Sequence, residues 1–299
     1  MAQEVAASNT EHPALRGARF IVVGVLINLA LAIIKGVAGI LGNSYALIAD
    51  AMESSLDVFQ SIVVWSGLRI AARPPDKDHP YGHGKAEPIA AVAVSMGLLF
   101  GALVIAVQSI REIVASSTSP APFTLIVLVV VIVAKETLFR VMSGVGAAIE
   151  STAVRSDAWH HRSDAITSAA AFVGIGIAVV GGKGYENADD WAALFACMII
   201  AFNGFRLLRP AVGEVMDVAP DPAVEAQVRE VAMTVAGVRS LHVCWVRKMG
   251  FEYFVDLHVK VDGSITVHDG HDVAHRVKDA VRFVNPRIRD VLIHIEPED

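Results

Sequence analysis

The pattern of apolar and polar residues divides the chain at about residue 210. Before that point, six stretches are apolar over roughly the 20 residues that a helix needs to cross a bilayer. These stretches, spans one to six, cover residues 20–41, 45–70, 89–110, 123–149, 158–182 and 191–208. After it, shorter periodic segments predict two helices and three strands. We expect the helices at 221–235 and 268–281, and the strands at 241–246, 253–261 and 288–295.

The breaks between the spans carry turn residues such as Gly42-Asn43, Ser119-Pro120 and Gly181-Gly182. Basic residues gather at the other ends of the spans. Because positive residues are enriched on the cytoplasmic side, both termini are predicted to be cytoplasmic. An even number of spans requires the same, so the charge pattern and the span count agree.

Three parts are therefore expected along the chain. Residues 1–15 are expected to form a disordered tail. They are not expected to be a signal peptide, because they lack its basic start and apolar core. Residues 16–210 read as a six-helix membrane domain. Residues 211–299 follow the order helix, strand, strand, helix, strand, which predicts a small α+β sandwich with its helices on one face. The absence of a targeting peptide is compatible with a bacterial inner membrane.

Composition supports this division. Hydrophobic residues make up 54% of the 299 residues and charged residues 19%, and the mean hydropathy is +0.52. A soluble domain carries about a quarter charged residues, so the apolar excess indicates a membrane protein. The net charge of −6 argues against a nucleic-acid partner, which requires a basic face. The two cysteines, Cys197 and Cys244, are expected to be free thiols.

Acidic residues interrupt the apolar pattern inside the second span. Glu53 and Asp57 are four residues apart and share a helix face, and Asp50 lies one turn before Glu53. A carboxylate at the bilayer centre costs about 2.5 kcal/mol or more. The cluster therefore requires protons or a bound cation to compensate its charge.

The fifth span repeats this spacing with His160 and Asp164. Two helices that each present such a pair can place four ligands around one point. Three carboxylates and one imidazole suit zinc and also accept iron, cobalt or cadmium. Either pair alone could face water at the membrane surface, but the repeated spacing favours a metal site.

Other histidines lie outside the spans. In the loop after span two, Asp76, His79 and His83 could hold a second metal, although a solvated polar turn explains them equally well. In the soluble part, histidines and an acid occupy predicted strands and one helix face, which allows a further metal site: His242, His258, His268, His271, His275, His294 and Glu296. Simple solvent exposure is the alternative, and we expect it of His268 and His275.

Three motifs identify a family. They are Ser44-x5-Asp50-x6-Asp57, the run His-Pro-Tyr-Gly-His-Gly-Lys-Ala-Glu over residues 79–87, and Trp-His-His-Arg-Ser-Asp over residues 159–164. Together they make the chain resemble the cation diffusion facilitator family of zinc, iron, cobalt and manganese transporters. The resemblance extends from about residue 16 to residue 299.

The resemblance implies three metal sites and a charge interlock. The transport site would consist of Glu53, Asp57, His160 and Asp164, and an interfacial site of Asp76, His79 and His83. The cytoplasmic site would comprise His242, His258, His271, His294 and Glu296. Lys85 and Asp217 would form the interlock. The family also implies a homodimer with a ferredoxin-like cytoplasmic domain.

This resemblance predicts a proton-coupled exporter of a divalent transition metal rather than an enzyme. Zinc ranks first, with Fe²⁺, Co²⁺ or Cd²⁺ next, because His160 supplies an imidazole ligand. Many zinc-transporting relatives carry Asp or His at the position of Glu53, and this departure weakens the preference for zinc, since the longer glutamate can favour a larger ion. Manganese ranks lower, because the manganese-transporting members of the family that the chain resembles have a carboxylate at the position of His160. The same spans could instead carry a small organic cation, or anchor a metal sensor that does not transport. No HExxH, GxSxG or P-loop pattern indicates a membrane enzyme.

Overall fold

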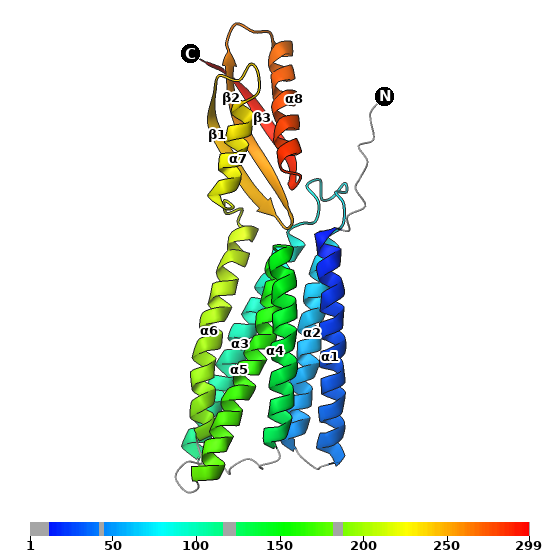
Figure 1. Cartoon of the computed structure of the whole chain (residues 1–299), viewed down its shortest axis with the longest axis vertical. Coiled ribbons are helices and arrows are strands. Elements are labelled where there is room, and N and C mark those ends of the chain that lie inside the picture. Colours follow the sequence, from blue (N-terminus) through cyan, green and yellow to red (C-terminus); the bar gives the residue numbers. More distant parts are fainter. Residues whose placement is uncertain (1–11, 42–44, 116–123, 182–187, 299) are drawn as a thin grey trace. The chain divides into compact units, whose positions relative to one another are not determined.

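The structure, a computed structural model, describes residues 12–41, 45–115, 124–181 and 188–298 (Figure 1). The described residues form two units, which divide between Val212 and Gly213. The first unit contains six long helices. They are α1 (Pro13–Leu41), α2 (Tyr45–Ala71), α3 (Ala86–Ala115), α4 (Thr124–Ala148), α5 (Thr152–Gly181) and α6 (Ala188–Val215). The expected tail, residues 1–15, lies mostly outside the described residues, and α1 begins at Pro13.

All six helices have 25 residues or more, and at about 1.5 Å per residue each is long enough to cross a bilayer. Among the described residues, three of these helices are also apolar enough to cross a membrane. The apolar segments are Pro13–Ile34, Ala86–Arg111 and Trp191–Val215. The other three helices carry charged residues that their neighbours bury. The six-helix prediction is confirmed. The three less apolar helices, α2, α4 and α5, place buried charged side chains inside the bundle.

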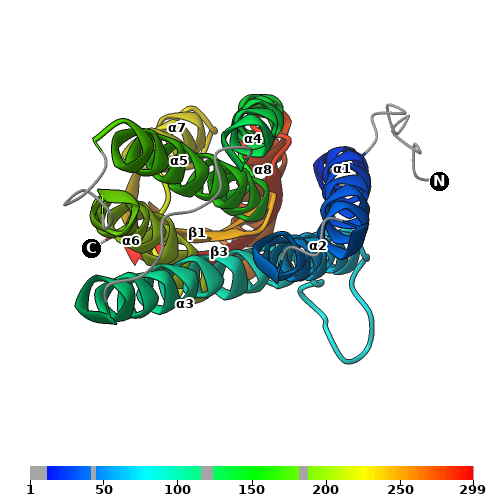
Figure 2. The same ribbon diagram turned by 90° about the horizontal axis from the view of Figure 1, so that it is seen from below.

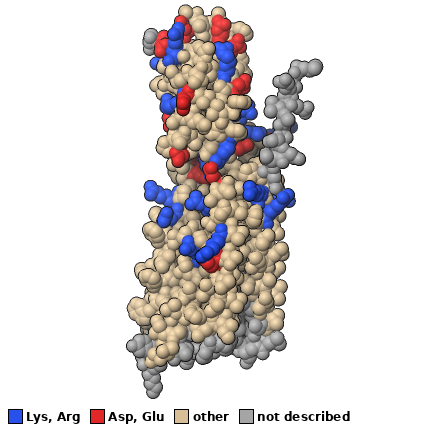
Figure 3. All heavy atoms as spheres, viewed as in Figure 1, with Lys and Arg blue, Asp and Glu red and all other residues tan. Residues whose placement is uncertain are grey.

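The six helices pack so that polar groups face inward. Helix α2 packs against α1 and α3, and α5 packs against α4 and α3 (Figure 2). Large apolar side chains such as Leu26, Ile33 and Phe100 are exposed on the outside, as expected of a surface that faces lipid. On the face shown in Figure 3, Lys, Arg, Asp and Glu of this unit gather near one end.

Helix α5 begins at Thr152, six residues before the start that the apolar pattern predicts. The reason is Glu87 at the start of α3, whose buried carboxylate accepts hydrogen bonds from Ser151 Oγ at 2.6 Å and from the backbone N–H of Ala153 at 2.8 Å. Thr152 Oγ1 also donates to it. A negative charge at a helix N-terminus is favourable because the first N–H groups have no partners within the helix.

The second unit follows the predicted order of elements. It consists of α7 (Pro222–Met233), β1 (Ser240–Met249), β2 (Glu252–Asp262), α8 (Val267–Val284) and β3 (Ile288–Glu298). Asp221 caps α7 with Pro222 as its first residue, and Thr266 with Asp269 forms a capping box on α8. The sheet order is β1-β2-β3, with β2 antiparallel to β1 and parallel to β3. This ferredoxin-like αββαβ fold is as expected.

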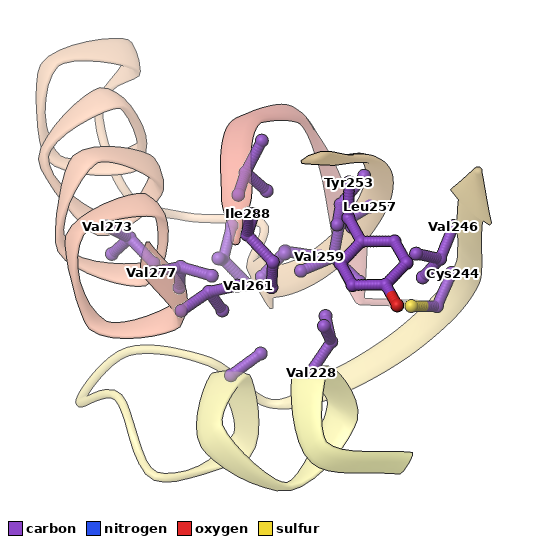
Figure 4. Close-up of a cluster of buried hydrophobic side chains, with 14 residues drawn as sticks. Val228, Cys244, Val246, Tyr253, Leu257, Val259, Val261, Val273, Val277 and Ile288 are labelled. Atoms are coloured by element: carbon purple, nitrogen blue, oxygen red, sulfur yellow. The ribbon is translucent and has the colours of Figure 1, made fainter. Parts of the chain in front are cut away.

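The core of this unit lies between the sheet and its two helices (Figure 4). Val255, Leu257 and Val259 alternate along β2 toward the helices, and Val228 of α7 and Val277 of α8 meet them. The even-numbered residues of β2 point to the opposite face, because successive side chains on a strand alternate. That face carries His258 and its neighbours on β1 and β3.

Candidate metal centres

Three ligand residues from two helices converge inside the first unit. Asp57 of α2 and His160 and Asp164 of α5 each offer an atom, and these atoms all lie within 4.8 Å of one another. His160 Nε2 lies 3.0 Å from Asp57 Oδ1 and 3.8 Å from Asp164 Oδ2. Asp57 and His160 are buried. The fourth residue of the expected site, Glu53, is on α2 one turn before Asp57, but its side chain lies outside the described residues.

A lysine joins this cluster from a third helix. Lys135 of α4 is 1% exposed, and its ammonium donates to Asp57 Oδ2 and to Asp164 Oδ2, both at 2.7 Å. A buried carboxylate is costly unless it is paired. The lysine gives both carboxylates a hydrogen-bond donor and offsets one of their two negative charges. The sequence prediction did not include this residue.

The positive charge of Lys135 would repel any metal ion that binds at this site. Two unit charges 4 Å apart interact by about 4 kcal/mol at an effective dielectric constant of 20, so an ammonium and a divalent ion at that distance repel by about 8 kcal/mol. A metal held by Asp57 and Asp164 would share the oxygens that now bind Lys135 Nζ. The two cations therefore compete for the same carboxylates.

A second buried polar group lies on the same face of α5, one turn before His160 and His161. Asp157 accepts a hydrogen bond from Ser61 Oγ of α2 at 3.1 Å, and its other oxygen lies 3.7 Å from His161 Nε2. Asp157 and His161 are fully buried. Asp157 Oδ2 and both ring nitrogens of His161 make no hydrogen bond within the described residues. This group, which we call the Asp157 cluster, was also absent from the sequence prediction.

The loop between α2 and α3 brings its three predicted ligands together. Asp76 Oδ1 accepts from the backbone N–H of His79 at 2.7 Å and lies 3.1 Å from His79 Nδ1. Asp76 Oδ2 is 3.4 Å from His83 Nε2. The backbone hydrogen bond from His79 holds the pKa of Asp76 below its usual range, so the carboxylate is charged and available at neutral pH.

In the second unit, the exposed face of the sheet collects four predicted ligands. Glu296 of β3 lies 2.7 Å from His258 Nδ1 of β2 and 3.1 Å from His242 Nδ1 of β1. His294 pairs with His258 across the strands, and its Nε2 is 4.0 Å from Glu296. Partial burial raises the pKa of Glu296, but the hydrogen bonds from His258 and His242 outweigh it, and the pKa lies below the ordinary value.

A bulge in β1 makes this arrangement possible. The pairing with β2 shifts between Leu241 and Cys244, so two residues of β1 lie opposite one residue of β2. Leu241 and Cys244 can then both pack toward the helices, while His242 between them faces the other side beside His258. A strand without the bulge would have turned one of these core residues outward.

The remaining predicted residues lie elsewhere. His271 is on α8, where its ring contacts His275 at a centroid distance of 4.5 Å, and it is not part of the His242–His258–Glu296 group. His268 is exposed on the same helix and lies 3.9 Å from Asp272. Lys85 and Asp217 fall in the two separate units, so their interlock stays a prediction.

Both parts of the chain match known protein families. Residues 21–216 match the cation efflux transmembrane domain, and residues 220–298 match the cytoplasmic domain of cation efflux proteins. The first match alone covers more than half of the chain. The chain belongs to the cation diffusion facilitator family. The family consists of metal-cation transporters, so this member is a multi-pass membrane transporter and not an enzyme.

Relatives of this cation diffusion facilitator match most of its length. Magnetosome protein MamB of Magnetospira sp. (strain QH-2) is 32% identical over 91% of this chain and 92% of its own length. Manganese efflux system protein MneP of Bacillus subtilis (strain 168) is 30% identical over 92% of this chain and 94% of its own. Among solved structures, a variant of MamM-CTD is 28% identical and covers 26% of this chain and 98% of its own, with a TM-score of 0.26.

Proposed function

We propose that this chain exports a divalent transition metal from the cytoplasm, with zinc as the preferred ion. The observation that carries the proposal is the convergence of Asp57, His160 and Asp164 in the buried part of the helical unit. A buried group of this composition binds a cation because its negative charge has to be compensated. Glu53, one turn before Asp57 on α2, is proposed as the fourth ligand.

The donor atoms support zinc over harder ions. Imidazole nitrogen suits zinc, iron and other late transition metals, whereas manganese favours carboxylate and water oxygens. One histidine with carboxylates therefore ranks zinc first, with Fe²⁺, Co²⁺ and Cd²⁺ next. The similarity to a manganese efflux protein of Bacillus subtilis makes manganese the ion that most needs direct comparison.

Export is proposed to be coupled to inward proton movement. His160 Nε2 and Asp57 Oδ1 lie 3.0 Å apart, which is close enough for one proton to bridge them, and a metal that bound both atoms would take the place of that proton. Metal and proton therefore exclude each other at these two atoms, which is the requirement for exchange. Transport of one metal against two protons would be electroneutral.

The other two clusters are proposed to bind metal outside the transport site, one at the membrane surface and one in the cytoplasm. Asp76, His79 and His83 would bind metal at the membrane surface. His242, His258, His294 and Glu296 would sense cytoplasmic metal in a homodimer. His271 lies away from this group within one subunit, so it would complete the site from the second subunit. In this proposal residues 16–210 transport the ion and residues 211–299 sense it and dimerise.

Orientation is proposed from the distribution of basic residues. Arg16, Arg19, Arg73 and Arg155 are exposed at the end of the helical unit where α1 and α5 begin and α2 ends. The positive-inside rule assigns that end, and with it both termini, to the cytoplasm. A bacterial inner membrane is the proposed location.

Metal uptake into inverted membrane vesicles tests the proposal. Zinc, Fe²⁺, Co²⁺, Mn²⁺ and Cd²⁺ are compared for the wild type, for Asp57→Ala, and for Glu136→Ala as a control acid that pairs with Arg140 on the outside of α4. We expect zinc uptake that falls at least tenfold in Asp57→Ala and changes less than twofold in the control. Equal uptake by wild type and Asp57→Ala would refute the site. Metal binding without any uptake would indicate a sensor.

A further inference from the structure

Lys135 occupies the position that a transported ion would take. Its ammonium lies at 2.7 Å from one oxygen of Asp57 and one of Asp164, which are two of the four proposed ligands. It reaches them from α4, a helix that contributes none of the proposed ligands. Its side chain is 2% exposed, so it belongs to the interior of the site and is not a surface residue that happens to lie nearby.

The lysine and a divalent ion cannot bind these two carboxylates together. A metal would lie about 2.0–2.2 Å from each carboxylate oxygen it binds, and the ammonium already donates to those oxygens. The repulsion between the two cations favours a single occupant. Since lysine carries its charge on a flexible stem of four carbons, it can leave the carboxylates without a change in the backbone.

The Asp157 cluster offers the displaced ammonium a second anion. Asp157 lies seven residues before Asp164 and three before His160, so it shares their face of α5. Its Oδ2 is buried without a hydrogen-bond donor among the described residues. Ser61, one turn after Asp57 on α2, holds the other oxygen of Asp157 and fixes the carboxylate in place.

We propose that Lys135 is an exchangeable internal cation that binds Asp57 and Asp164 when metal is absent and moves to Asp157 when a divalent ion takes its place. Lys135 stays charged throughout. This inference rests on the proposed function, because it requires that metal binds Asp57, His160 and Asp164. It adds a role for two residues that do not bind the metal themselves.

The exchange has a physical advantage for a carrier. A transporter must return to its starting conformation after it has released the ion, and two unpaired carboxylates inside the bundle would oppose that step. Lys135 pairs with both of them in the empty carrier and offsets one of their two negative charges. It also lowers the affinity for metal, since every binding event has to displace the ammonium, and so it assists release.

Two variants and their combination test the exchange in the full-length protein. Zinc affinity is measured in detergent by competition with a chelator, with Glu296→Gln and Asp76→Asn present throughout to weaken the cytoplasmic and interfacial sites. Lys135→Met removes the competitor, so we expect zinc to bind at least tenfold tighter while zinc transport falls at least tenfold. Asp157→Asn removes the second anion, so we expect zinc to bind at least fivefold more weakly.

The double variant is the decisive comparison. If Asp157 acts only through Lys135, then Asp157→Asn has no effect on zinc affinity once Lys135→Met is present, and the double variant binds as tightly as Lys135→Met alone. Arg140→Met removes an exposed cation from the same helix and is expected to change affinity and transport less than twofold. Zinc affinity that is unchanged or weaker in Lys135→Met overturns the proposal.

Further variants separate this inference from the proposed function. If Lys135→Met does not fold, Asp157→Asn alone decides, and an unchanged zinc affinity in that variant overturns the exchange. Asp57→Asn and Asp164→Asn are measured in the same way. If they abolish zinc binding while the Lys135 and Asp157 variants leave it unchanged, the exchange fails and the transport site stands. If they also leave it unchanged, the proposed function itself fails.

Discussion

On the surface of the second unit, Lys278 of α8 forms an ion pair with Asp290 of β3 and ties the helix to the edge strand. The hydrogen bond from Lys278 holds the pKa of Asp290 below the ordinary value of 3.8. A carboxyl group with a lowered pKa in the folded state stabilises the fold above its unfolded pKa. That contribution is lost as the pH falls through the folded pKa.

Asp290→Asn should therefore destabilise the second unit at pH 7 but not in strong acid. Both side chains are partly exposed, so the pair is screened and the expected loss is about 0.2–1 kcal/mol. We expect the difference from wild type to shrink as the pH falls below 3.8. Urea titrations of the full chain, with pulsed hydrogen exchange in β3 as the readout, measure it at each pH. A difference that persists at low pH would contradict the assignment, and Asp279→Asn on the exposed face of α8 serves as the control.

Residue patterns reveal some of the buried charges and not others. Asp57, His160 and Asp164 could be predicted because acids and a histidine at helical spacing stand out in apolar spans. Lys135 could not, because one lysine near the middle of an apolar run does not show which neighbouring helix it faces. Its position beside Glu136 and before Arg140 resembles the polar end of a span. The depth of Lys135 becomes evident only when α4 is packed against α5 and the Lys135 ammonium reaches Asp57 of α2.

Helices α2 and α3 approach closely enough at Gly67 to exclude a side chain. A Cβ at this position would lie 2.5 Å from Ala90 Cβ and 3.0 Å from the carbonyl oxygen of Ala86. These are contacts with backbone or with the first side-chain atom, which cannot rotate away. Because Gly67 has no side chain, α2, which carries Asp57, can pack directly against α3.

Gly67→Ala should separate α2 from α3. Overpacking of this kind costs about 1–3 kcal/mol, and we expect lower thermal stability in detergent together with reduced zinc transport. Gly144→Ala in α4, where nothing lies within 4 Å of the added Cβ, is the matched control and should leave stability unchanged or raise it by up to about 1 kcal/mol through helix propensity. Equal melting temperatures for the two variants would contradict the close packing at Gly67.

The existence and type of every element could be predicted from periodicity, but some ends could not. Helix α5 extends back to Thr152 because Glu87 of α3 caps it, and a cap from a distant helix leaves no local signal. The bulge in β1 is a similar case. Strict alternation from Leu241 places Cys244 on the outer face, and only the packed core shows that the register shifts before it.

At the scale of the whole molecule, the proposed function links metal binding at the histidine-bearing face of the sheet to formation of the dimer. Its carboxylate is Glu296, and the fifth proposed ligand, His271, lies outside the group within one subunit. A metal bound by Glu296, His242 and His258 could therefore recruit His271 from a second copy. The negative charge of the chain, −6 in total, would oppose association until cations reduce it.

Zinc should therefore tighten the dimer, and Glu296→Gln should abolish the effect. We expect at least a tenfold decrease in the dimer dissociation constant for wild type in saturating zinc, and less than twofold for Glu296→Gln. Analytical ultracentrifugation in detergent measures both. His268→Ala, on α8 but outside the group, should behave as the wild type does. Equal tightening of the dimer in Glu296→Gln would contradict a sensing role for this site.

The motifs in the sequence predicted the family, but not the ion pairs of Lys135 inside the helical unit. These ion pairs involve α2, α4 and α5 together, with Lys135 and Asp157 in roles that no spacing rule reveals. For the same reason, the account depends most on where a metal ion binds inside the helical unit.

Anomalous X-ray scattering from crystals of the full-length protein soaked in zinc tests that location directly. The account predicts a zinc peak inside the helical unit, about 2.0–2.2 Å from His160 Nε2 and from oxygens of Asp57 and Asp164, with Lys135 Nζ displaced toward Asp157. A peak confined to the sheet of the second unit, or Lys135 still bound to both carboxylates at full zinc occupancy, would contradict it.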